Sequence, residues 1–403
     1  MPGEARHVAV TGLGLACGLG LTVDQAWSAA LRGETPAHTY TLFDPTGLDA
    51  PFGVALPEDA IAWFAGQIRK PHRRLMTRGT QLTVCSGAEA LMDAGPSLDP
   101  ARVGVVVGTT GTGYIRPEGE DDADRILKAM PNSPAAWLSL LHKLQGPAFV
   151  VGTACASGAY ALAMAFELIR NGTCDAVLAG AGDSSLNRHD VAGFGSLLAL
   201  AEPGDDVRFA SRPFDRDRTG FVMGEGSGFL MLEHPERARA RGARVYATMA
   251  QPALTSEAYN ILAPAPGGAG MARCMASALH LARLTPQDIG HINAHGTATR
   301  LNDLYETRAI EAVFGAHARR VLVSSTKSMT GHCLAGAGGV EAVLAVKALT
   351  EGVVPPTATL RCADPELGLD YVPLTPRRAD LRHVMSNSFG FGGHNGVVVL
   401  SAP

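Results

Sequence analysis

The chain has 403 residues, of which 46% are hydrophobic and 18% are charged, and its formal net charge at pH 7 is −4. This length predicts two or three domains, or one large duplicated unit, around a sizeable core. The small net charge excludes a chain-wide basic field for nucleic acid.

Cysteine usage and the opening residues exclude further classes. The seven cysteines are scattered without a CxxC pair, which argues against a disulfide framework and a zinc site. No cationic start followed by a long apolar run opens the chain, so we expect no signal peptide. The uncharged stretch 144–166 contains proline and several glycines, which favours a buried strand, turn and helix over a membrane span. We therefore expect a cytoplasmic protein.

Strand-like and helix-like segments alternate along the chain, which predicts a layered α/β fold. In the first part we expect a strand at 7–11 followed by a glycine-rich turn, a helix at 23–33, a strand at 103–107, residues 148–154 leading into a helix at 157–171, and a strand at 175–181. In the second part we expect helices at 270–283, 303–314 and 336–351, and strands at 287–293, 320–325, 383–387 and 396–400. The repeated pattern favours a duplication into halves 1–241 and 242–403.

A candidate nucleophile lies where a predicted strand passes into a predicted helix, in the segment Gly152-Thr153-Ala154-Cys155-Ala156-Ser157-Gly158. The start of a helix carries partial positive charge and free amides, and both favour a thiolate. Small neighbours leave room for an acyl group, so this site suits a thiol that attacks a thioester. The alternative is a buried structural cysteine.

A histidine follows a predicted strand in the segment Asn293-Ala294-His295-Gly296-Thr297-Ala298-Thr299, with Asp303 and Glu306 shortly after it. A neutral imidazole in this position can donate a hydrogen bond to a developing oxyanion. The two threonine hydroxyls suit a polar linker. A hydrogen-bonded turn histidine is the alternative.

Two further segments stand at predicted element ends. Lys327 and His332 lie in the polar loop 324–332, and the helix start nearby favours a neutral His332 ring. In the segment 387–395, Phe389 and Phe391 alternate with glycines, which indicates a mobile loop with an aromatic gate. The alternatives are a solvated lysine in a capping loop and an ordinary hairpin turn.

Cys155, His295, Lys327, His332 and the FGFGG loop, in this order and spacing, resemble the β-ketoacyl-acyl-carrier-protein (ACP) synthases of the thiolase superfamily. The segments 212–217 (RPFDRD) and 220–226 (GFVMGEG) match that family too, and the resemblance covers essentially the whole chain. It implies a thiolase-like fold, which is a duplicated α/β/α/β/α layered architecture, and an acyltransferase that needs no cofactor.

The resemblance also implies the chemistry. Cys155 takes an acyl group from ACP, and the backbone amides of Cys155 and Phe391 form the oxyanion hole for that transfer. Neutral His295 and His332 then hold malonyl-ACP and stabilise the enolate that forms on loss of CO2. The enolate attacks the acyl group in a decarboxylative Claisen condensation, in fatty acid or polyketide biosynthesis.

Supporting roles follow from the same resemblance. Lys327 and Glu306 pair to orient the histidines, with Asp303 near them, and Thr297 and Thr299 contact the pantetheine arm. Phe389, Gly390 and Gly392 complete the gate around Phe391. In some relatives a structural cation sits near the positions of Asn293, Glu341 and Ser386, although no metal is needed for the reaction.

The subtypes of the family differ in the catalytic residues that they require. A cysteine with two histidines is typical of the elongating synthases, since the initiating enzymes have an asparagine where His332 stands. Thiolases need a second cysteine in the last loop, which here has Phe389 and Phe391. The intact Cys155 argues against an inactive chain-length subunit. Two alternatives stay open: a ketosynthase subunit of a type II polyketide system, and a related acyltransferase that uses a non-carbon nucleophile.

A nicotinamide enzyme is a rival from another class, but the segment 12–17 (GLGLAC) lacks the last glycine of GxGxxG. For partners we expect acyl and malonyl ACP, and a homodimer or a heterodimer with a chain-length-factor-like subunit. We expect neither nucleic acid nor membrane as a partner.

Two departures from the family pattern and one basic cluster concern specificity and docking. His394 stands where the family usually has threonine, and the segment between Gly113 and Cys155 is shorter than usual. The densest basic cluster is a candidate docking surface for the acidic carrier protein, with a solvated helix face as the alternative. It comprises Arg69, Lys70, Arg73, Arg74 and Arg78, to which Arg212 is added.

Overall fold

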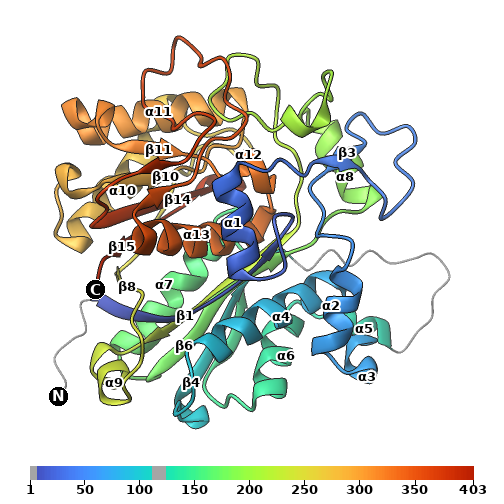
Figure 1. Ribbon diagram of the computed structural model, residues 1–403, viewed down its shortest axis with the longest axis vertical. Coiled ribbons are helices and arrows are strands. Elements are labelled where there is room, and N and C mark those ends of the chain that lie inside the picture. The colour runs from blue at the N-terminus through green and yellow to red at the C-terminus, as the bar shows by residue number, and fades with distance from the viewer. Residues whose placement is uncertain (1–6, 111–123) are drawn as a thin grey trace.

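The computed structural model describes residues 7–110 and 124–403. Ten of the described strands form one continuous path in two halves, and β2-β3 and β12-β13 form two separate two-stranded sheets (Figure 1). The first half has the order β1-β7-β6-β4-β5, with β1 (His7–Cys17), β4 (Val103–Gly108), β5 (Ala148–Val151), β6 (Ala176–Asp183) and β7 (Gly226–Glu233). The second has the order β8-β15-β14-β10-β11, with β8 (Ala247–Ala250), β10 (His291–Asn293), β11 (Leu322–Ser324), β14 (His383–Gly390) and β15 (His394–Ser401).

The two halves repeat one topology. In each, the first strand pairs antiparallel with the last, and the last pairs antiparallel with the one before it in the chain. That strand pairs in parallel with the second strand, which also pairs in parallel with the third. The strands β1 and β8 pair with each other and connect the halves, while β9 (Ala253–Ser256) adds to β15. The duplicated α/β fold expected from the sequence is confirmed.

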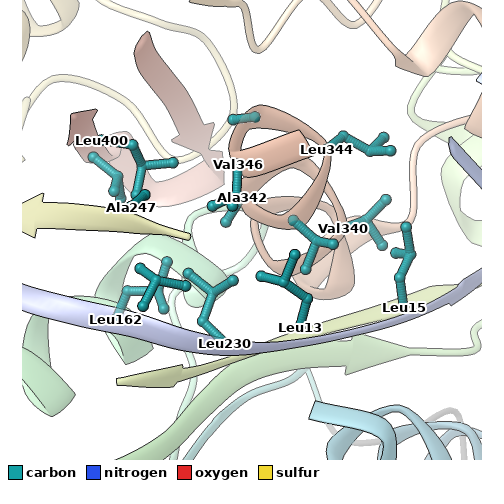
Figure 2. Close-up of a cluster of buried hydrophobic side chains, with 14 of the residues drawn as sticks. Leu13, Leu15, Leu162, Leu230, Ala247, Val340, Ala342, Leu344, Val346 and Leu400 are labelled. Atoms are coloured by element: carbon teal, nitrogen blue, oxygen red, sulfur yellow. The ribbon is translucent and has the colours of Figure 1, made fainter. Parts of the chain in front are cut away.

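Helices form three layers around the sheet (Figure 1). The helices α7 (Ser157–Arg170) and α13 (Ala337–Glu351) lie between the halves and pack on strands of both. On the outside, α4 (Arg78–Asp93) and α6 (Ser133–His142) cover the first half, and α10 (Ala269–Ala282) and α11 (Arg300–Phe314) cover the second. The central core joins Leu13, Leu15 and Leu230 of the first sheet to Val340 and Ala342 of α13 (Figure 2).

Glycines allow the backbones of α7, α13 and β7 to pack in direct contact. A Cβ atom on Gly158 of α7 would lie 2.6 Å from the amide nitrogen of Gly339 on α13. A Cβ on Gly228 of β7 would lie 2.3 Å from the carbonyl carbon of Gly339. These distances are below van der Waals contact, so only glycine lets α13 sit this close to both neighbours.

The expected turn after residue 11 is wrong, because β1 continues to Cys17. Its glycines serve close packing, since a Cβ on Gly14 would lie 1.9 Å from the carbonyl oxygen of Ser86 on α4. The side chains of Asp93 and Glu89 on α4 accept hydrogen bonds from the amides of Leu13 and Leu15, both at 2.9 Å. The helix α4, which the sequence analysis did not predict, therefore explains the glycines of β1.

The remaining elements are short. They are α1 (Val23–Arg32), α2 (Ala60–Gln67), α3 (Lys70–Arg73), α5 (Asp124–Ala129), α8 (Arg188–Ser196), α9 (Pro235–Ala240), α12 (Lys327–Thr330), β2 (His38–Thr39), β3 (Phe52–Gly53), β12 (Val353–Val354) and β13 (Arg377–Arg378). Gly33 and Gly352 adopt left-handed conformations directly after α1 and α13, as helix-ending glycines do. Among the described residues, no helix is long and apolar enough to cross a membrane.

Candidate active site

The turn between β5 and α7 presents Cys155. Ala154 has a left-handed φ of +49°, and the thiol that follows is 8% exposed. Its sulfur lies 3.1 Å from Nε2 of His332. The end of β14 approaches this turn closely, because a Cβ on Gly390 would lie only 2.8 Å from the carbonyl oxygen of Thr153. A thiol and an imidazole thus meet in a buried pocket, as nucleophile–base pairs do.

The expected lowering of the Cys155 pKa by the helix start is wrong for the resting site. Burial raises the pKa of this thiol to about 12, while the charge of Lys327 and the amides of Phe391 and Cys155 act in the opposite direction. The physical reason is that desolvation of a thiolate outweighs the partial charges at a helix end. Cys155 therefore rests as a thiol, with Nε2 of His332 within hydrogen-bond distance of its sulfur.

The two histidines come from separate loops and face each other. His295 follows β10, and its ring lies edge-on to that of His332 with centroids 5.4 Å apart. The backbone of His332 is fixed because its amide donates to Val222 at 2.7 Å and its carbonyl accepts from Gly224 at 3.0 Å. Burial lowers the pKa of both rings well below the usual value, and Lys327 lowers it further. Both rings are therefore neutral near pH 7.

Lys327 and Glu306 do not form the pair that the family resemblance implied. The Lys327 ammonium instead pairs with the buried carboxylate of Glu341, and it lies 3.4 Å from Nδ1 of His295. Glu306 accepts hydrogen bonds from the amides of His295 and Gly296, both at 2.8 Å. It positions the histidine through the backbone. The reason lies in how the helices pack. The helix α13 brings Glu341 into contact with Lys327, whereas α11 brings Glu306 into contact with the backbone of the turn 295–296.

Asp303 supports the loop that contains Phe214 rather than the residues that orient the histidines. Its carboxylate accepts from the amide of Phe214 at 2.8 Å and lies 3.7 Å from the Arg218 guanidinium. It thereby ties α11 to the segment 212–217 (RPFDRD). The ring of Phe214 stacks on Tyr371, with centroids 4.1 Å apart.

Of the residues expected near a structural cation, Asn293 and Ser386 are in contact. Asn293 donates to the hydroxyl of Ser386 at 3.2 Å, and the second carboxylate oxygen of Glu341 is buried without a partner among the described residues. The amide oxygen of Asn387 is likewise buried and unpartnered in residues 7–110 and 124–403. Carboxylate and amide oxygens suit a hard cation, so Asn293, Glu341, Ser386 and Asn387 would hold it. It would supply positive charge beside Glu341.

A cavity of about 810 Å³ opens onto these groups. Cys155, His295, His332, Phe389 and Phe391 line it. Thr297 and Thr299 also line it, and their hydroxyl oxygens are 2.9 Å apart. The Phe391–Gly393 segment forms a hairpin turn between β14 and β15, with Gly392 at φ +81°. The Gly392 amide donates to the carbonyl of Ile261 at 2.8 Å, which ties this turn to a second loop.

His394 points away from the reacting groups. Its ring meets Tyr160 edge-on with centroids 6.0 Å apart, and it does not belong to the cavity lining. The short segment before Cys155 begins with residues 114–123, which lie outside the described residues.

The basic cluster divides into exposed and structural members. Arg69, Lys70 and Arg74 are exposed, and Arg73 is half-buried; Arg74 pairs with Asp124 at 3.1 Å. Arg78, in contrast, points inward and binds the buried carboxylate of Glu225 at 2.7 Å. Its place in a docking surface is therefore wrong. Arg212 is half-buried, and within the described part its Nε has no partner.

Two features of the site and the exposure of one cysteine escaped the sequence analysis. The ring of Phe221 packs edge-on against His332 at 5.2 Å, and the buried Asp183 lies close enough to Cys155 to raise the pKa of that thiol. Cys362 is the exposed cysteine. The segment GFVMGEG was the signal for Phe221, whereas nothing in the local sequence marks Asp183 or the exposure of Cys362.

Comparison with known proteins decides the family. The N-terminal domain model of β-ketoacyl synthases matches residues 5–238, and the C-terminal domain model matches residues 246–361. The chain belongs to the β-ketoacyl synthase family. As a β-ketoacyl synthase, it is an acyltransferase of fatty acid or polyketide biosynthesis.

Individual relatives match over the full length. This synthase is 42% identical to 3-oxoacyl-[acyl-carrier-protein] synthase 2 of Synechocystis sp., with 97% of each chain covered. It is 39% identical to a putative polyketide β-ketoacyl synthase 1 of Streptomyces halstedii, with 99% of each covered. Among solved structures, the ishigamide ketosynthase/chain length factor superposes with a TM-score of 0.89 at 30% identity, covering 99% of this chain and 100% of the other.

Proposed function

We propose that this β-ketoacyl synthase condenses an acyl group on Cys155 with malonyl-ACP, releasing CO2 and a β-ketoacyl-ACP. Support comes from the contact of the Cys155 sulfur with His332 at 3.1 Å, inside a cavity that His295 also lines. The name of the Synechocystis relative, 3-oxoacyl-[acyl-carrier-protein] synthase 2, includes the acyl carrier protein.

In the first half-reaction, the thiol of Cys155 attacks the thioester carbonyl of acyl-ACP. The thiol proton passes to Nε2 of His332 and then to the leaving sulfur of ACP, so the acyl group changes sulfur without net proton release. The amides of Phe391 and Cys155, which already oppose the rise in the thiol pKa, hold the oxyanion of the tetrahedral intermediate.

In the second half-reaction, malonyl-ACP loses CO2 and its thioester carbonyl becomes an enolate oxygen. Neutral His295 and His332 donate hydrogen bonds to that oxygen. Their low pKa values keep both rings neutral, and each neutral ring has one N–H to donate. The enolate carbon attacks the acyl carbonyl, and the Cys155 sulfur leaves and regains a proton. Thr297 and Thr299 hold the pantetheine arm at the cavity wall.

The sheet edge supports a dimer. Among the described strands β5 pairs only with β4, and its Phe149, Val150 and Val151 are half-buried. An unpaired apolar edge is a template for another chain, and β5 leads directly to Cys155. We therefore place the second subunit, a copy or a chain-length-factor-like partner, on β5.

The cytoplasmic location and the domain boundary at 241 stay predictions.

The decisive experiment is intact mass spectrometry after incubation with acyl-ACP and then malonyl-ACP. We expect one acyl adduct on Cys155, its discharge by malonyl-ACP, and no adduct in Cys155→Ala. A Cys362→Ser background removes labelling of the exposed thiol without touching the cavity. An adduct that survives malonyl-ACP but transfers to an alcohol or amine would instead favour a non-carbon nucleophile.

A further inference from the structure

The cavity has a polar wall that the condensation does not use. We call it the polar wall, and it consists of Thr110, Ser185, His189 and Asp190. All four residues come from the N-terminal half, whereas the threonines assigned to pantetheine come from the C-terminal half. A plain hydrocarbon chain gains nothing from such side chains, because their water must be removed when it enters.

The helix α8 carries two residues of the wall, His189 and Asp190, in its first turn. Leu198, which is 89% exposed, follows the end of α8 at the cavity mouth, whereas Asp190 lies in its first turn. Between them, Phe194 packs edge-on against Phe221 at 5.5 Å, and Phe221 packs on His332. Phe194, Phe221 and His332 therefore form a connected part of the cavity lining between α8 and the catalytic cysteine.

Asp183 lies beneath the wall and fixes the orientation of two hydroxyls. Ser185 donates to its carboxylate at 2.8 Å, and Thr110 donates to its other oxygen. Burial raises the pKa of Asp183, while the hydrogen bonds from Thr110, Ser185 and the Ala335 amide lower it. Because both hydroxyl hydrogens are committed to Asp183, the oxygens of Thr110 and Ser185 present only lone pairs to the cavity.

Asp190 adds a further acceptor. It is half-buried, and one of its oxygens accepts from the Asn187 side chain at 2.7 Å. No lysine or arginine in residues 7–110 and 124–403 forms an ion pair with it. The wall is thus rich in acceptors and negative charge, with the imidazole of His189 at its exposed edge.

We propose that this cavity selects acyl chains that carry a hydrogen-bond donor, a hydroxyl or an amine, over hydrocarbon chains of equal length. The inference rests on the proposed acylation of Cys155. A hydroxyl or ammonium group on the chain donates to Thr110, Ser185 or Asp190, whereas a ketone meets only acceptors. A site built to bind a donor discriminates strongly against a substrate that lacks it, because its polar groups are then left unpaired.

The test measures the rate of Cys155 acylation from matched pantetheine thioesters of several chain lengths. At each length the chain ends in a methyl, a methyl ketone, a hydroxyl or an ammonium group. We expect the hydroxyl or ammonium chain to react roughly tenfold faster than the methyl chain at one or more lengths, with no such gain for the ketone. Because no carrier protein is used, docking does not affect the comparison.

Variants assign the effect to the wall. Ser185→Ala should reduce the preference for the hydroxyl chain, and Asp190→Asn should reduce the preference for the ammonium chain while keeping an oxygen for Asn187. Ser196→Ala, on the exposed side of the same helix, is the matched control and should leave both preferences unchanged.

Three results would overturn the inference. Methyl chains that react as fast at every length would refute donor selection but leave the condensation intact. A preference that survives in both Ser185→Ala and Asp190→Asn would refute the role of the wall. Failure of every thioester and of acyl-ACP to label Cys155 would refute the proposed function, and this inference with it.

Discussion

At the scale of single residues, the site separates the two halves of the reaction between two histidines. His332 touches the Cys155 sulfur, whereas His295 touches Lys327. Both rings are kept neutral by burial. Only His332 is therefore placed to accept the thiol proton, while both can donate to an enolate.

This geometry predicts different defects for the two substitutions. His295→Ala and His332→Ala should each slow malonyl-ACP decarboxylation roughly 100–1000-fold, because each removes a donor to the enolate oxygen. The rate of Cys155 acylation should fall less than the rate of decarboxylation in both variants. The fall in acylation should be larger in His332→Ala than in His295→Ala. Single-turnover acylation by mass spectrometry and CO2 release measure the two steps separately. Equal losses in both steps for both variants would contradict the division of labour, and circular dichroism checks that the variants fold.

Lys327 tunes the histidines through charge, which leads to a pH prediction. Its ammonium opposes protonation of both rings, so it lowers their pKa beyond the effect of burial. In Lys327→Met combined with Glu341→Gln, which avoids an unpaired buried carboxylate, the ring pKa rises. Activity that requires neutral rings is lost as pH falls through that pKa, so the acid inflection of decarboxylation should move to higher pH.

Lys347→Met is the matched control for that shift. Lys347 pairs with Glu351 at 2.5 Å near the end of the same helix α13 and does not line the cavity. The pH profile of decarboxylation by Lys347→Met should coincide with that of the parent enzyme. An acid inflection that stays in place in the Lys327 variant would mean that the lysine acts only as a packing residue.

At the scale of elements, backbone contact between α7 and α13 sets the position of the nucleophile. Gly158→Ala should lower the free energy of unfolding by about 1–3 kcal/mol, because its Cβ would meet the Gly339 amide at 2.6 Å. Acylation should fall as well, since Gly158 lies in the first turn of the helix that follows Cys155.

The control for Gly158 is a glycine in open space. A Cβ on Gly66 in α2 would meet nothing within 4 Å, so Gly66→Ala should raise stability by about 0.4–1 kcal/mol. Urea denaturation measures both changes. If Gly158→Ala were as stable as the parent, α13 would not be held by this contact.

The same elements show what the sequence could and could not predict. Helices closed by glycine, such as α1 and α13, and the motif residues on strand ends were found, because local patterns mark them. The course of β1 was missed, since its glycines are explained by α4, a partner distant in sequence. The partner of Lys327 was assigned to Glu306, and only the packing of α13 reveals Glu341. Burial of Cys155, which reverses the expected pKa shift, likewise depends on elements from both halves.

At the scale of the whole molecule, carrier docking is the property that most depends on the surface. Arg69 precedes α3, and Lys70 and Arg73 lie within it. Arg69 and Lys70 are exposed and Arg73 is half-buried, and α3 lies at the opposite end of the view from α11 (Figure 1). Arg78 is excluded by its buried partner Glu225. Acyl carrier proteins are acidic, so the remaining cations form a candidate docking surface in an otherwise slightly acidic chain.

Reversing this charge should therefore weaken the use of the carrier but leave the chemistry intact. Lys70→Glu with Arg73→Glu should raise the KM for acyl-ACP with little change in kcat, and should spare a small pantetheine thioester that never touches α3. Added salt should reproduce the effect in the parent enzyme, because exposed charges are screened over about 8–10 Å at physiological ionic strength. Arg319→Glu with Arg320→Glu, exposed after α11, is the matched reversal and should not alter the KM. A KM that stays constant in the α3 variant would identify this helix as a solvated face and move the search for the docking surface to the cavity mouth around Leu198.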